Sequence, residues 1–125
     1  MSEKNAIRAL DVNKEADVVI YTHDFEGRFS AINKAGEDIT GYTLSELRSL
    51  TIFELMKPKD VEKLRPRMTP KFLGVVPIPW EIRILTRNGR EITLPVSLRL
   101  SFEAGKAVVQ GISQPLPKSA MPVPE

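Results

Sequence analysis

The sequence predicts an α+β fold, in which a five-stranded antiparallel sheet carries short helices on one face and a flanking helix stands at the N-terminus. Two observations lead to this prediction. After the flanking segment, two short strand patterns come first, four short helical patterns follow, and strands return only near residue 80. From there to residue 113, apolar and polar side chains alternate between turn signals, as in a three-stranded meander. Strands and helices segregated in this order are typical of the α+β class.

Residues 1–15 are expected to form the flanking helix. Their apolar side chains recur at the spacing of one helical face, with charged residues between them. They are Ala6, Ile7, Ala9, Leu10 and Val12. A chain of 125 residues has room for one small core, so this stripe must cover either its own sheet or a second subunit.

The domain itself is expected to span residues 16–114 and to open with two strands. The β-branched and aromatic run from Val18 to Tyr21 suits a strand. A turn at Glu26-Gly27 then leads to a second strand over residues 29–32, where side chains alternate. Asn33 can accept hydrogen bonds at a helix N-terminus, and Gly41 can adopt the left-handed conformation that ends a helix. A short helix from Asn33 to Gly41 follows.

Two capping boxes predict two very short helices, near residues 44–49 and 52–57. In each box a threonine and the glutamate three residues later satisfy one another's backbone N–H groups. The pairs are Thr43 with Glu46 and Thr51 with Glu54.

Asp60 is expected to cap a fourth helix that runs through Leu64. Pro66 and Pro70 limit this helix, because proline lacks a backbone donor and clashes with the preceding turn. Residues 66–79 are therefore expected to be irregular, as a binding-site lid or a mobile loop.

The meander begins at Trp80. Asn88-Gly89 is a strong two-residue hairpin signal, and a second turn at 103–106 leaves residues 107–113 as the last strand. Pro95 falls within the clearest strand pattern and cannot donate to a neighbouring strand, so a bulge or a locally unpaired position is predicted there.

The order of these motifs resembles the opening of a PAS domain. That family has an acidic residue, a turn glycine, a strand that ends in asparagine and a short helix that ends in Gly-Tyr. Here Asp24, Gly27, Asn33 and Gly41-Tyr42 follow the same order. Two further strings resemble the family's GY(S/T)xxEL motif and its later hairpin: Gly41-Tyr42-Thr43 with Ser45-Glu46-Leu47, and Arg87-Asn88-Gly89-Arg90. The resemblance covers residues 17–114.

The resemblance implies that the first strand pairs with the last and closes the sheet at its centre. The core then lies between the sheet and the helices, and it either holds a small molecule or fills itself with side chains. Because PAS domains often dimerise through the flanking helix, the resemblance also implies a homodimer with Ile7, Leu10 and Val12 at its interface.

The candidate ligand-pocket residues are apolar side chains expected between sheet and helices, together with positions that recur in the family. They are Phe29, Asn33, Ile39, Tyr42, Phe53, Met56, Leu64, Met68, Phe72, Trp80, Ile82 and Leu98. For the methionine and aromatic cluster we favour core packing, since only an unfilled volume would make it a pocket. For Asn33 and Tyr42 we favour helix capping and core closure over ligand contact.

Composition restricts the cofactors. The absence of cysteine excludes disulfides, thiolate nucleophiles and cysteine-based metal sites. It also excludes the cysteine-linked flavin and chromophore of two PAS branches. The haem branch usually uses a histidine on the helix that here spans about 60–72, where the sequence has none, so that mode is unsupported.

The single histidine, His23, stands beside Asp24 at the end of the first strand. A surface or hydrogen-bonded role is favoured over that of an axial ligand or catalytic base, because either of these needs a second placed partner. No serine lies in a nucleophile elbow and no glycine-rich phosphate loop occurs. We therefore expect no enzyme, no catalytic residue and no metal site.

Charge and hydropathy give little sign of nucleic-acid or membrane binding. The net charge is +2, and six Lys/Arg between Lys57 and Lys71 face only two acidic residues. We favour a solvated helix face there over an anion or nucleic-acid site, because charge runs without interleaved aromatics usually only solvate. No apolar stretch could cross a bilayer and the N-terminus lacks a signal-peptide core, so a cytoplasmic location is expected.

One departure from the family concerns the exit from the last strand. Signalling PAS domains commonly leave it through a D-I-T motif and a coiled-coil linker, and Gly111 to Gln114 match the approach to that motif. Pro115-Leu116-Pro117 then stand in its place and exclude a continuous helix. Residues 115–125 are expected to be a proline-rich tail or linker, extended or disordered.

Taken with the resemblance, these patterns favour a cytoplasmic, homodimeric PAS-type sensory or interaction module of a bacterial-style signalling pathway, such as a histidine-kinase-associated two-component system. Any ligand, of unknown identity, would be held non-covalently and would shift the population of helix or dimer packings that an output partner detects. The alternative is a ligand-free dimerisation or docking module with a packed core. Haem binding through His23 is a weaker alternative.

Overall fold

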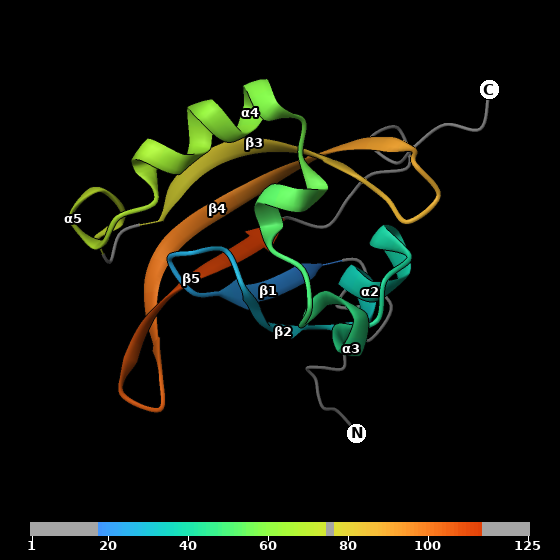
Figure 1. The fold of residues 1–125 in the computed structure, drawn as a ribbon. Coiled ribbons are helices and arrows are strands. Elements are labelled where there is room, and N and C mark those ends of the chain that lie inside the picture. The colour runs from blue at the N-terminus through green and yellow to red at the C-terminus, as the bar shows by residue number, and fades with distance from the viewer. Residues whose placement is uncertain (1–17, 75–76, 114–125) are drawn as a thin grey trace.

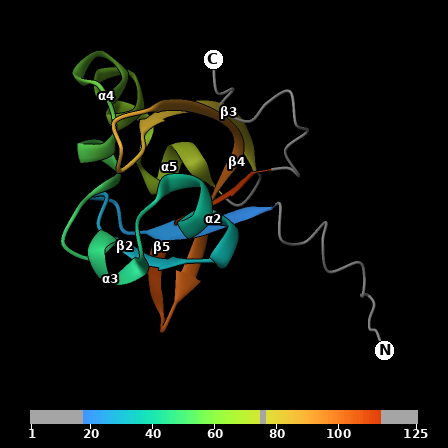
Figure 2. The same ribbon diagram turned by 90° about the vertical axis from the view of Figure 1, so that its right-hand side faces the viewer.

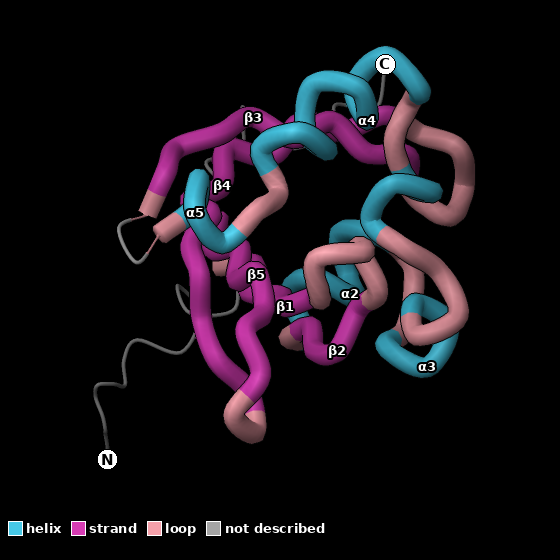
Figure 3. The backbone as a smooth tube through the Cα atoms, turned by 60° about the vertical axis from the view of Figure 1, so that its left-hand side comes forward, coloured by secondary structure: helices cyan, strands magenta, loops and turns pink. Residues whose placement is uncertain are grey.

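Five strands form one antiparallel sheet in the computed structural model, which describes residues 18–74 and 77–113. The strands are β1 (Val19–His23), β2 (Phe29–Ile32), β3 (Ile78–Leu85), β4 (Glu91–Glu103) and β5 (Lys106–Ser113). Their order across the sheet is β2-β1-β5-β4-β3, which can be followed in Figure 3. The first strand therefore pairs with the last at the centre, as predicted, in a register from Val19↔Ser113 to His23↔Val109.

Short helices pack against one face of this sheet (Figures 1 and 2). They are α2 (Lys34–Thr40), α3 (Leu44–Leu47), the 3-10 helix η1 (Ile52–Leu55), α4 (Pro58–Leu64), the 3-10 helix η2 (Arg65–Arg67) and α5 (Pro70–Leu73). Leu47, Ile52 and Leu64 from the helices are buried in one cluster with the sheet residues Ile82 and Leu98. The predicted α+β fold is confirmed.

Local capping accounts for the start of this helical layer. Asn33 caps α2 by accepting a hydrogen bond from the Gly36 N–H, and Gly41 ends the helix with a φ of 83°. Both predicted capping boxes are present, at Thr43 before α3 and at Thr51 before η1. These bonds satisfy backbone donors that a short helix cannot satisfy internally.

Three expectations about the proline-containing segments are wrong. Asp60 does not cap α4, because Pro58 begins that helix and Asp60 lies within its first turn. Residues 66–79 are not wholly irregular, because Pro66 and Pro70 stand in the first turns of η2 and α5, where a missing N–H is harmless. Strand β3 accordingly begins at Ile78 rather than at Trp80.

Pro95 causes no bulge. It pairs with Glu81 in a β3–β4 register that runs without a shift from Ile78↔Leu98 to Leu85↔Glu91. The described β4–β5 register starts one residue later, at Val96↔Ser113, so the missing N–H of Pro95 falls outside it. At Pro95, strand β4 therefore pairs with β3 but not, within the described residues, with β5.

The predicted flanking helix (1–15) and proline-rich tail (115–125) lie outside the described residues. Within the described ranges, no helix combines the length and the apolar character needed to cross a lipid bilayer.

Candidate functional site

The sheet and the first helices enclose a small internal cavity of about 20 Å³. Its walls are apolar apart from two hydroxyl-bearing residues, Tyr21 and Thr40. The lining residues are Val19, Tyr21, Phe29, Ile32, Thr40, Leu47, Ile52, Leu55, Ile82, Ile84, Leu94 and Val96. A space of this size has room for about one water molecule.

Tyr21 is positioned by the alternation of β1. Residues 19, 21 and 23 are buried, whereas Ile20 between them is 38% exposed. The ring of Tyr21 lies across Gly111, its neighbour on β5, so closely that a Cβ added to Gly111 would lie 2.3 Å from the tyrosine Cζ. Gly111 therefore makes the space that the tyrosine ring occupies.

The Tyr21 hydroxyl is buried and has no hydrogen-bond partner in the part of the chain that the structure describes. Burial raises the pKa of Tyr21 well above its ordinary value, so the group remains a neutral donor. A buried polar group without a partner destabilises a fold by roughly 1–3 kcal/mol.

The Thr40 hydroxyl does not pair with the Tyr21 hydroxyl, because it makes two hydrogen bonds elsewhere. Its Oγ1 donates to the Gly36 carbonyl at 2.8 Å and accepts from the Tyr42 N–H at 3.2 Å. A water in the cavity would need two or more polar partners, and Tyr21 is the one lining residue with a free polar group. The lining side chains thus provide a single unused donor.

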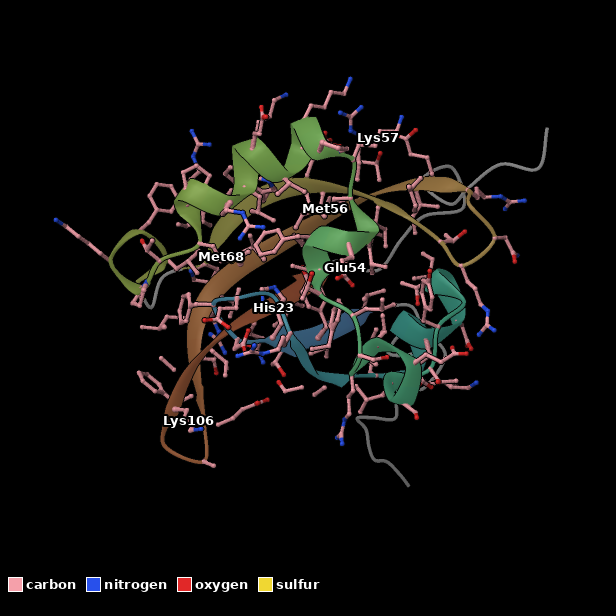
Figure 4. The ribbon with its side chains drawn as sticks, viewed as in Figure 1. His23, Glu54, Met56, Lys57, Met68 and Lys106 are labelled. Carbon is pink, nitrogen blue, oxygen red and sulfur yellow. The ribbon has the colours of Figure 1, made fainter. Side chains whose placement is uncertain are left out.

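His23 extends the same row and is 1% exposed. Its ring stacks on Tyr21 with centroids 5.7 Å apart and meets Phe29 edge to face at 6.0 Å. Nδ1 lies 2.8 Å from the Asp24 carbonyl oxygen, which identifies Nδ1 as the protonated nitrogen of the neutral ring. Figure 4 shows His23 at the end of β1, beside the turn into β2. The hydrogen-bonded role expected for this residue fits the geometry.

Acidification is expected to destabilise the domain through His23. Burial lowers the pKa of His23 below its ordinary value, and the carbonyl and charge of Asp24 only partly oppose this. The unfolded chain then binds the proton more readily, so the free energy of unfolding falls as the pH drops from about 7 to 5, by at most about 1.4 kcal/mol per pH unit. Urea titrations at several pH values measure this slope.

A His23→Gln variant provides the control for this prediction. His23 is the only histidine, and the carboxyl pKa values that are lowered, those of Asp24 and Asp60 among them, affect stability only at more acidic pH. The variant should lose the slope between pH 7 and 5. An unchanged slope in His23→Gln would contradict the assignment.

The twelve predicted pocket residues lie in several different parts of the structure. Phe29 and Ile82 line the cavity. Six others are packed in or against the core around it: Ile39, Tyr42, Phe53, Leu64, Met68 and Leu98. Met56 and Trp80 border an open hollow near α4. Phe72 does not face the interior, because the single turn of α5 turns Leu73 to the core and leaves Phe72 45% exposed.

Asn33 holds the strand–helix junction. Besides capping α2, its Oδ1 accepts from the Ile20 N–H at 3.2 Å and its Nδ2 donates to the Val18 carbonyl at 2.6 Å. All of these bonds are made to backbone, which supports the structural role favoured for this residue.

Only two of the twelve lining residues are in the predicted set, and Tyr21, whose hydroxyl is unpaired, is among those missing from it. The sequence predicts a strand there, and the place of Tyr21 two residues before the only histidine puts both rings on one face of β1. That alternation could have identified it. No sequence pattern near Tyr21 indicates that Gly111, on β5, accommodates its ring.

The described residues do not fit haem. His23 is packed between two aromatic rings, and the neighbouring cavity is far smaller than a porphyrin. Among the described residues, no group of three or more His, Asp and Glu side chains could hold a metal ion.

Comparison with solved structures identifies the fold. No family model matches the sequence, and no curated protein matches it. A domain of a sensory box sensor histidine kinase/response regulator from Geobacter sulfurreducens is 28% identical, with a TM-score of 0.64 over 88% of this chain and 91% of that one. The PAS domain of an HTR-like protein from Haloarcula marismortui is 19% identical, with a TM-score of 0.69 over 90% and 93%.

A third similar structure is the PAS domain of the quorum-sensing receptor RpfR from Cronobacter turicensis, in complex with C12:0. It is 22% identical, with a TM-score of 0.59 over 78% of this chain and 93% of that one. The TM-scores show that the three have the same overall fold as this chain, and the order of motifs in the sequence predicts that fold. The chain therefore has the fold of a PAS domain.

Proposed function

We propose that this chain is a PAS-type sensory module that binds a small, largely apolar ligand between its sheet and its first helices. The observation that carries the proposal is the hydroxyl of Tyr21, a buried donor without a partner among the described residues, on a residue that lines the apolar cavity. A ligand with one hydrogen-bond acceptor would satisfy this donor and would find apolar walls on every other side. The similarity to a domain of a sensor histidine kinase supports a signalling role.

Ligand binding would have to change the structure. Pockets for small molecules usually measure about 300–1,000 Å³, whereas this cavity measures about 20 Å³. The sheet walls are fixed by long registers, so the proposal requires the four-residue helices α3 and η1 to shift outward. The ligand would favour the expanded packing, and an output partner would detect that shift in population.

Tyr21→Phe tests the proposal in two directions. Removal of the unpaired hydroxyl is expected to stabilise the ligand-free domain by about 1 kcal/mol, measured by urea unfolding. The same change is expected to weaken ligand binding about tenfold, because the complex loses its one polar contact. C12:0, which the Cronobacter turicensis RpfR domain binds, is a suitable probe.

Tyr42→Phe is the matched control, since Tyr42 is the second of two tyrosines and lies outside the cavity. It should alter neither quantity. Lower stability of Tyr21→Phe, or equal affinity of both variants for a ligand that binds the wild-type chain, would argue against the proposed role of Tyr21.

A second candidate function is a docking module with a packed core, and the small cavity volume favours it. Native mass spectrometry of the purified chain separates the two candidates. A co-purifying small molecule supports the sensory module. Its repeated absence, together with no binding of C12:0 or other apolar acids, supports the docking module.

We also propose a homodimer through the flanking helix and the outer face of the sheet. On that face Ile20 is 38% exposed and pairs with the half-buried Ile112, which leaves an apolar patch for the stripe of Ile7, Leu10 and Val12. Leu10→Glu is expected to shift the chain to monomer in sedimentation equilibrium. Ser2→Glu, a change of equal charge off the stripe, should leave the dimer intact.

A further inference from the structure

The segment of residues 57–71 is more than a solvated basic face, because aromatic rings from other elements lie beneath its arginines. The Arg65 guanidinium sits 4.1 Å from the ring centroid of Phe53, which belongs to η1. Arg67 lies 5.0 Å from the ring of Trp80, on β3, and 5.9 Å from that of Phe72. The sequence favoured solvation because it showed no interleaved aromatics, and the fold supplies them.

Most of the cations of this segment form no ion pair within the described residues. Asp60 pairs with Arg83 at 2.7 Å, and Lys57 pairs with Glu91 at 3.3 Å. No ion pair is formed in the described ranges by five other cations of this segment, Lys59, Lys63, Arg65, Arg67 and Lys71. The surface thus combines cations that form no ion pair with the guanidinium of Arg67, whose Nη1 also donates to the Lys63 carbonyl at 3.0 Å.

Apolar surface lies directly beside these cations. An open hollow of about 460 Å³ has Met56, Pro79 and Trp80 in a wall that is otherwise polar and charged, and Phe72, which like Trp80 lies under Arg67, is 45% exposed. Tryptophan, methionine, arginine and phenylalanine are the residue types enriched at the centres of protein–protein interfaces. Lysine and arginine around such a centre favour an acidic partner through charge complementarity.

We propose that the Arg67–Trp80 surface, made up of Lys63, Arg67, Phe72 and Trp80, docks an acidic segment of a partner protein in which apolar side chains stand next to carboxylates. The apolar residues would occupy the hollow beside Trp80, and the carboxylates would meet Lys63 and Arg67. This docking does not depend on a ligand in the interior.

A protein segment suits this surface better than nucleic acid does. The hollow also contains the carboxylates of Asp60 and Glu81, which would repel a continuous phosphate backbone. A peptide can place its carboxylates away from Asp60 and Glu81 and its apolar side chains between these two residues.

Trp80 is the only tryptophan, so its fluorescence reports on this surface in the intact chain. The probe is a short synthetic peptide in which glutamate alternates with leucine, and the comparison peptide carries lysine in place of glutamate. We expect a saturable change in Trp80 fluorescence with the acidic peptide only, weakened by added salt. A single-stranded DNA oligonucleotide should compete poorly.

The variants Lys63→Glu and Arg67→Gln are each expected to weaken binding of the acidic peptide about tenfold. The Lys63 side chain makes no ion pair among the described residues, so Lys63→Glu should leave the fold intact, which circular dichroism can check. Lys106→Glu is the matched control: it makes the same change of charge at the β4–β5 hairpin, far from α4 (Figure 4), and should not affect binding.

The proposal is overturned if the acidic and basic peptides bind equally, if Lys106→Glu weakens binding as much as Lys63→Glu does, or if the oligonucleotide binds more tightly than the acidic peptide. Failure to bind C12:0 would leave the result unaffected, because that experiment concerns the interior.

Discussion

Replacement of Gly111 by alanine is expected to destabilise the domain by about 3 kcal/mol, at the upper end of the usual cost of overpacking a core. The new methyl group would lie 2.3 Å from Cζ and 2.5 Å from the hydroxyl oxygen of Tyr21, distances that force the ring to move. The ring has little freedom to do so, because it is buried and packed against His23 and Phe29. The free energy of unfolding in urea measures the effect.

A double-mutant cycle identifies the cause. In a Tyr21→Leu background the clash is absent, and Gly111→Ala should then be neutral or slightly stabilising, since alanine loses less backbone entropy than glycine on folding. If the alanine destabilises both backgrounds equally, contact with the tyrosine ring is not the reason that position 111 is glycine.

Asn33→Ala is expected to have an effect of similar size, about 3 kcal/mol. Loss of an N-cap side chain alone costs roughly 0.5–2 kcal/mol, and the variant also removes the partners of the Ile20 N–H and the Val18 carbonyl. Because these groups belong to β1 and the cap belongs to α2, the substitution loosens the strand and the helix together. Hydrogen exchange should show faster exchange at both elements, alongside the lower unfolding free energy.

Two variants serve as controls for Asn33. Asn33→Asp retains an acceptor for the Gly36 and Ile20 N–H groups but loses the donor to Val18, so its stability should fall between those of the wild type and the alanine variant. Asn88→Ala, at the exposed β3–β4 turn, should change stability by less than about 0.5 kcal/mol. An alanine variant at position 33 as stable as Asn88→Ala would show that the junction bonds contribute little.

The parts of the fold that short-range chemistry decides could be predicted from the sequence. The cap at Asn33, the two capping boxes and the left-handed Gly41 each depend on residues within a few positions of one another, and all were predicted correctly. The predictions for Pro66 and Pro70 were wrong because proline can begin a helix as well as end one. The neighbouring residues decide which occurs: the Thr69 side chain, directly before Pro70, accepts from the Phe72 N–H and caps the helix that Pro70 begins.

The site could be predicted less well, because its features join residues far apart in the sequence. Tyr21 and Gly111 meet only because β1 pairs with β5 in one particular register. Arg67 meets Trp80 only because α4 and η2 pack over β3. Apolar spacing indicates that a side chain is buried, but not whether it borders a remaining space, so the candidates Phe53 and Met68 are core residues while Val19 and Leu55 line the cavity.

The pairing of β1 with β5 also brings the two ends of the described domain together. Val19 at the start of β1 lies opposite Ser113 at the end of β5, so the chain enters and leaves the sheet on adjacent antiparallel strands, about 5 Å apart. A unit with adjacent ends can be inserted into a surface loop of a host protein without forcing that loop open. For the same reason a short linker could join the two ends, and a circular permutant opened at the exposed Asn88-Gly89 tip should retain the sheet order.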